Sequence, residues 1–88
     1  MLFRSLGVLR LVVTGAQHAQ RVELAATFTG WEPVALLREG DQWRLDRPIT
    51  SGTHRVLLRI DGGPWLVPGN LPAAADDFGG SVGLLTVP

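Results

Sequence analysis

The chain has 88 residues, in which eight arginines balance eight acidic residues and there is neither lysine nor cysteine. A formal net charge of zero, with no long run of one sign, makes nucleic acid and anionic membranes poor candidate partners. The length fits one small domain over residues 1–88, the 45% apolar content predicts that it folds, and the absence of cysteine fits a reducing cytoplasm.

The N-terminal half alternates apolar and polar residues with the period of half-buried strands. Residues 8–13 predict a strand rather than the apolar region of a signal peptide, because Arg10 interrupts the apolar stretch. In residues 22–28 the even positions are apolar, so we expect them to face the core. No run approaches the length of a membrane span.

Turn signals divide the middle of the chain. Residues 34–37 are short and apolar, residues 38–42 predict a hairpin turn, and Trp43 shares a face with Leu45 in the strand that follows. A second turn at 50–53 leads into an alternating strand that ends near residue 60. Asp61 and Gly62 then predict a tight turn, because both residue types tolerate positive φ.

The last third is less regular. Prolines at 64, 68 and 72 predict an irregular segment, residues 73–80 predict a loop, and residues 81–87 predict a final strand. About seven short strands separated by turns, with no helical stripe, are typical of an all-β, immunoglobulin-like antiparallel β-sandwich.

Catalysis is difficult to build from these residues, so we expect no enzyme. The two histidines, His18 and His54, lie in or beside predicted turns without a third metal ligand, so neither a metal site nor a cofactor is expected. The neighbouring carboxylates Asp76 and Asp77 point opposite ways on an extended chain and make a poor acid–base pair.

Three tryptophans and no tyrosine are the unusual part of the composition. Trp43 lies in phase with Leu45, which predicts a core residue. Trp31 and Trp65 each follow a turn and are flanked by residues that keep them out of a regular ladder. Two such aromatics on neighbouring loops either stack on sugar rings or cover the open edge of a small sandwich, and the pattern alone leaves both readings open.

The chain from residue 8 to residue 87 resembles the glycogen- and starch-binding module of carbohydrate-binding family forty-eight. This early-set sandwich occurs in the β subunit of AMP-activated protein kinase and before the catalytic domains of isoamylases and branching enzymes. Where the family has a loop with an Asp-Pro pair, this chain has residues 67–80, a form similar to that of small bacterial members of the isoamylase-N-like group. The resemblance rests on the order and spacing of Phe28, Gly30, Trp31, Trp43, Gly52, Asp61, Gly62 and Trp65.

The resemblance implies that Trp31 and Trp65 stack on α-glucan. The family's binding lysine falls on Leu57 and its binding asparagine near Val82 or Gly83, so Arg55 and Arg59 are the candidate replacements on the face of Leu57. The leading hypothesis is therefore non-catalytic binding of an α-glucan polysaccharide. The alternative is a structural or protein-docking early-set domain, and a host enzyme or regulatory protein is a further partner in either case.

Overall fold

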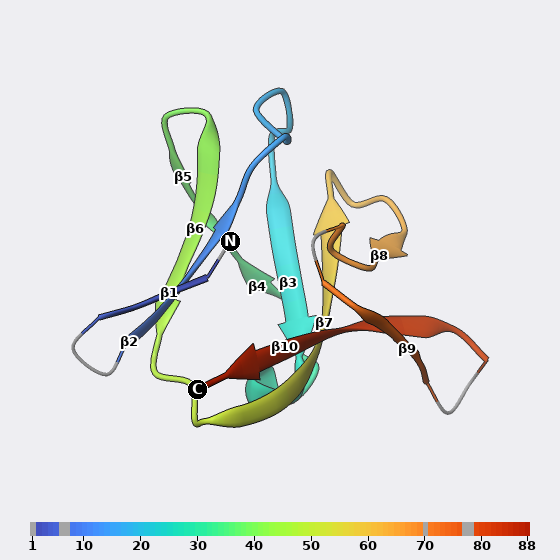
Figure 1. Ribbon diagram of the computed structural model, residues 1–88. Helices are drawn as coiled ribbons and strands as arrows, with labels where there is room; N and C mark the ends of the chain where they lie inside the picture. The colour runs from blue at the N-terminus through green and yellow to red at the C-terminus, as the bar shows by residue number, and fades with distance from the viewer. Residues whose placement is uncertain (1, 6–7, 70, 77–78) are drawn as a thin grey trace.

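Two antiparallel sheets make up the regular structure. The computed structural model describes residues 2–5, 8–69, 71–76 and 79–88, with side chains from residue 11 onward. The four-stranded sheet has the order β1 (Leu2–Ser5), β2 (Val8–Val13), β6 (Gln42–Arg47) and β5 (Leu37–Glu39). The six-stranded sheet has the order β4 (Val34–Ala35), β3 (Val22–Ala26), β7 (Gly52–Ile60), β10 (Ser81–Val87) and β9 (Ala73–Ala75), with β8 (Trp65–Leu66) paired to β7 (Figure 1).

The core lies between the two sheets, which confirms the predicted β-sandwich. Val22, Leu24 and Ala26 on β3 are fully buried, as their even spacing predicted. From the other sheet, Trp43 and Leu45 on β6 join the same apolar cluster, so the prediction that Trp43 is a core residue is also confirmed. None of the described residues forms a helix long and apolar enough to cross a membrane.

The described residues form ten strands instead of about seven, because short segments complete the sheets. β1 pairs with β2 in a segment where no strand was predicted. The supposed loop at 73–80 begins with β9, which hydrogen-bonds to the edge of β10. Alanine has low strand propensity, and Ala73–Ala75 form a ladder here because the edge of β10 offers unpaired backbone groups.

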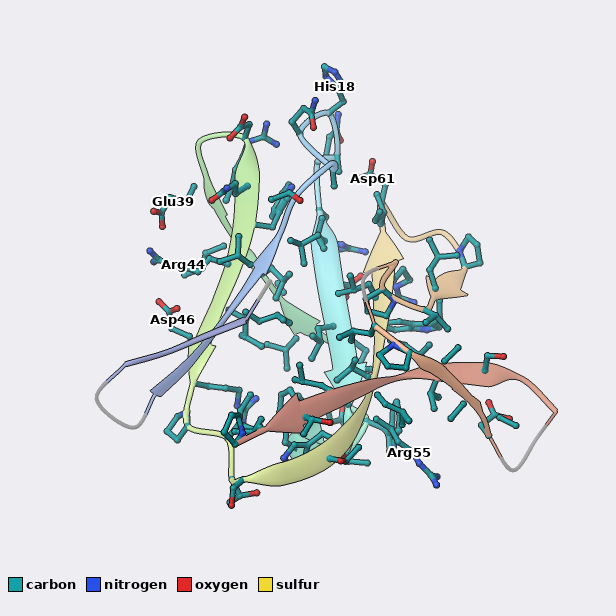
Figure 2. The ribbon with its side chains drawn as sticks, viewed as in Figure 1. His18, Glu39, Arg44, Asp46, Arg55 and Asp61 are labelled. Atoms are coloured by element: carbon teal, nitrogen blue, oxygen red, sulfur yellow. The ribbon has the colours of Figure 1, made fainter. Side chains whose placement is uncertain are left out.

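The loop before β3 is held from two sides. One carboxylate oxygen of Asp61 accepts hydrogen bonds from the backbone N–H groups of Gln20 and Arg21, at 2.7 and 2.8 Å. Asp61 and Gly62 both have positive φ, which confirms the predicted turn. Figure 2 shows Asp61 at the tip of β7, next to the loop that carries His18. The turn aspartate therefore joins two ends of β-strands that are distant in sequence.

On the opposite side, Arg38 fixes the same loop. Its guanidinium donates to the carbonyl oxygens of Ala19 and Gln17 and lies 5.3 Å from the ring centre of Trp43. The indole N–H of Trp43 donates to the carbonyl oxygen of Ala16 at 2.9 Å. The buried tryptophan thus contributes a hydrogen bond as well as apolar area.

An apolar cavity of about 340 Å³ lies between β2 and the inner face of β7 and β10. Pro68, Gly69 and Leu71 form part of its wall. Gly83 on β10 permits this approach, because a Cβ there would lie 3.0 Å from Cδ of Pro68 and 3.3 Å from Cδ1 of Leu71. Pro68 and Leu71 therefore pack on a position where only glycine fits without movement.

Candidate aromatic binding face

The candidate site lies on the outer face of the six-stranded sheet. Val56 and Leu58 of β7 point into the core, so the alternate residues Arg55, Leu57 and Arg59 point away from it. Arg55 is exposed and extends from β7 into solvent (Figure 2). Leu57 and Arg59 are half-buried. The two arginines expected to share a face with Leu57 therefore do so.

Trp65 lies on a strand, and the prediction that it is kept out of a regular ladder is wrong. β8 pairs with the far end of β7, and Trp65 is the direct partner of Arg59. The guanidinium carbon of Arg59 is 4.4 Å from the ring centre of Trp65, a close cation–π contact. One face of this half-buried indole is therefore occupied by the arginine. Pro64 precedes β8 and Val67 and Pro68 follow it, which explains why the strand has only two residues.

Trp31 lies in the turn between β3 and β4, where the chain reverses tightly. β3 ends at Ala26, two residues before the alternation in the sequence does, because Thr27–Thr29 form a 3₁₀ turn. The hydroxyl group of Thr29 accepts from the backbone N–H of Ala26 and donates to its carbonyl oxygen, both at 3.0 Å. The N–H of Trp31 donates to the same carbonyl at 2.9 Å. These bonds fix the backbone of Trp31 relative to the end of β3.

The backbone of Trp31 is unusual for so large a residue. It has φ of 63°, directly after Gly30 with φ of 64°, so two consecutive residues are left-handed. Glycine adopts this region freely, but a Cβ there costs about 1–2 kcal/mol. The Trp31 side chain is also 44% exposed. Trp31 therefore leaves nearly half of its surface open to solvent from a backbone conformation that carries a cost.

The two tryptophans lie apart on the sheet. Trp65 is level with Arg59 and hence with Glu23 on β3, whereas Trp31 bonds to Ala26, three residues further along β3. With about 3.3 Å per residue along a strand and about 4.8 Å between strands, their backbones are roughly 14 Å apart. The two tryptophans are therefore attached at different levels along the sheet.

The two positions where the family has polar contacts are apolar on this face. Leu57 is half-buried and Val82 is 3% exposed, so the positions of the family's lysine and asparagine carry apolar side chains. Arg59 uses its Nε–H to bond Glu23 at 3.1 Å. Within the described part of the chain, the Nη groups of Arg59 and the guanidinium of Arg55 have no acceptor. These N–H groups are the donors that a ligand would find next to Trp65 and Leu57.

Glu23 was not singled out in the sequence, yet it is the charged centre of this face. Its Oε1 is 3.1 Å from Nε of Arg59 and 3.3 Å from Nε of Arg21. The hydrogen bond from Arg59 and the positive charges of Arg21 and Arg59 lower the pKa of the Glu23 carboxyl below its ordinary value of 4.5, although partial burial opposes this shift. The sequence did show a glutamate at an outward position of β3. Its pairing with Arg59 could not be predicted from the sequence, because it depends on the register between β3 and β7.

The other candidate groups do not converge on this face. Within the residues that the structure describes, no three His, Asp or Glu side chains gather as a metal site. His54 packs edge-on against Phe28, with 5.5 Å between ring centres, and its Nε2 lies 2.8 Å from the carbonyl oxygen of Thr50. Asp76 accepts a bond from the N–H of Gly80, and Asp77 lies outside the described residues.

A separate ion-pair group lies on the opposite sheet. Figure 2 shows Glu39, Arg44 and Asp46 in line along β5 and β6. Arg44 pairs with Glu39, and its Nε is 3.0 Å from Oδ2 of Asp46. This group is on the other sheet from Trp31 and Trp65, so its residues supply control variants for the candidate site.

Comparison of the chain with models of known protein families gave no match, and comparison with curated protein sequences gave none either. The resemblance to carbohydrate-binding family forty-eight therefore rests on the motif residues themselves.

Proposed function

We propose that this chain is a non-catalytic binding module for α-glucan polysaccharide of the glycogen or starch type. In this proposal Trp31 and Trp65 each stack on a sugar ring, and Arg55 and Arg59 donate hydrogen bonds to hydroxyl groups. The observation that carries the proposal is Trp31, because its 44% exposure leaves aromatic surface open to a ligand, and its positive φ is a backbone cost that most residues in a folded protein avoid.

The spacing of the two tryptophans supports an extended ligand. The tryptophans are far enough apart for separate units of one chain, and the half-buried Leu57 between the arginines offers an apolar surface. Aromatic side chains give large contact area at low entropic cost, which suits the flat apolar faces of sugar rings. With few hydrogen-bond donors available, we expect weak binding, with a Kd from tens of micromolar to millimolar, or roughly 4–6 kcal/mol.

Affinity electrophoresis in native gels with and without glycogen tests this function. We expect glycogen to retard the wild-type protein and to retard Trp31→Ala and Trp65→Ala less. Leu37→Ala is the matched control, because Leu37 is a 61% exposed apolar residue on β5, in the other sheet. Each variant is first checked for cooperative urea unfolding, so that loss of binding is separated from loss of folding.

Two results contradict the proposal in different ways. If glycogen and soluble starch leave the wild type unretarded, glucan binding is refuted and the docking alternative gains. If retardation persists in the Trp31→Ala, Trp65→Ala double variant, the protein binds glucan through other residues, and the assignment of the stacking pair is wrong.

A further inference from the structure

A row of residues runs across the outer face of the six-stranded sheet and ends at Trp65. Backbone register places Ala35 of β4 beside Glu23 of β3, Glu23 beside Arg59 of β7, and Arg59 beside Trp65 of β8. Directly opposite side chains in antiparallel strands are near enough to interact. Glu23 and Trp65 are thus on either side of Arg59, and both contact it.

Arg59 is held from these two sides at once. Its Nε–H donates to Oε1 of Glu23 at 3.1 Å, and its guanidinium carbon lies 4.4 Å from the centre of the Trp65 ring. The Glu23 side chain is 12% exposed and that of Arg59 26%, whereas Arg21, the second partner of Glu23, is 61% exposed. Of the two ion pairs of Glu23, the less exposed one is therefore with Arg59, the residue that contacts Trp65.

This arrangement restricts what Trp65 presents to a ligand. A free arginine side chain samples many rotamers, and a charge-assisted hydrogen bond to a fixed carboxylate selects among them. With the guanidinium kept on one face of the indole, a sugar ring stacks only on the other face. The Nη N–H groups of Arg59 then stay at the rim of the indole, within reach of hydroxyl groups on that ring.

We propose that Glu23 is a positioning residue for glucan binding, which holds the Arg59 guanidinium on Trp65 and so fixes the one indole face that receives a sugar ring. This inference rests on the proposed function for its ligand, while the Glu23–Arg59–Trp65 contact itself is open to a test that needs no glucan. Glu23 does not touch the sugar in this scheme and acts through Arg59.

The test uses full-length protein labelled with 5-fluorotryptophan, since fluorine NMR gives one signal for each of the three tryptophans. Signals are assigned with Trp31→Phe and Trp65→Phe. We expect Glu23→Gln to shift or broaden the Trp65 signal and to leave those of Trp31 and Trp43 in place. Glycogen titration of the same samples is expected to give a Kd about three- to ten-fold higher for Glu23→Gln than for wild type.

Glu39→Gln is the matched control, because it removes a carboxylate paired with an arginine on the other sheet. It should change neither the Trp65 signal nor the Kd. A merely structural role of Glu23 would change stability without this selective effect on one tryptophan, so urea unfolding is measured for both variants.

The outcomes separate the two proposals. If the Trp65 signal of Glu23→Gln matches that of wild type, or if its Kd for glycogen is unchanged, the positioning role is overturned. If glycogen perturbs no tryptophan in the wild type while Glu23→Gln still moves the Trp65 signal, the contact is supported as a structural coupling and the glucan function is refuted.

Discussion

Trp31 gives the sharpest prediction, because its backbone and its side chain have opposite effects on stability. The residue is 44% exposed, so slightly more than half of its surface is covered in the folded state. Losing roughly 100–140 Å² of apolar contact at about 25 cal/mol per Å² gives an upper estimate of about 2.5–3.5 kcal/mol for truncation. Both Trp31→Ala and Trp31→Gly lose this term.

The two variants differ in the left-handed backbone at φ of 63°. At an ordinary position alanine is more stable than glycine by about 0.4–1 kcal/mol, because glycine raises the entropy of the unfolded chain. A Cβ in the left-handed region costs about 1–2 kcal/mol, which exceeds that difference. We therefore expect Trp31→Gly to be more stable than Trp31→Ala by about 0.5–1 kcal/mol, the reverse of the usual order.

Urea unfolding followed by fluorescence of the remaining tryptophans measures this difference, and thermal unfolding checks it. In a domain of this size a change of 0.5–1 kcal/mol corresponds to about 2–8 °C in Tm. The pair Leu37→Ala and Leu37→Gly is the control, since Leu37 lies in a regular strand and should show the usual order. If Trp31→Ala is the more stable variant, the left-handed conformation is not a cost at this position, and it no longer supports the proposed function.

Three further predictions concern residues around the site. Asp61→Ala should destabilise the fold by about 1–2 kcal/mol in urea unfolding, because two backbone N–H groups lose a carboxylate partner, whereas Asp61→Asn should lose less than half as much. Gly83→Ala should cost about 1–3 kcal/mol, since its Cβ would lie 3.0 Å from Cδ of Pro68, and an unchanged urea midpoint would contradict that contact. The pKa of the Glu23 carboxyl is lowered in the folded state, so its ionised form stabilises the fold above pH 4.5, and this stabilisation is lost as the pH falls through the folded-state pKa. The difference in unfolding free energy between wild type and Glu23→Gln should therefore narrow below pH 4.5. A constant difference down to pH 2.5 would contradict this.

Much of the fold was predictable because the strongest signals in the sequence are local. The alternation in residues 22–26 identified the core face of β3, and Trp43 in phase with Leu45 identified the inner face of β6. The Asp61–Gly62 turn followed from the φ preferences of its two residues. These features depend on backbone conformation and on which side chains avoid water, and both are properties of short segments.

The short strands were not predictable on the same basis. β8 and β9 have two and three residues, and prolines or alanines around them argue against strands. They form because β7 and β10 leave backbone groups unpaired at their edges, which depends on where other strands end. Trp65 was therefore expected in a loop, although it lies on a strand opposite Arg59.

Local patterns in the sequence predict a β-sandwich and indicate Trp31, Trp65, Arg55 and Arg59 as candidate binding residues. Their arrangement depends on contacts between strands: Arg59 covers one face of Trp65, Glu23 holds Arg59, and Trp31 is exposed with a left-handed backbone. These contacts follow from strand register. A shift of one residue between β3 and β7 would turn Glu23 away from Arg59, and nothing within either segment alone specifies their pairing.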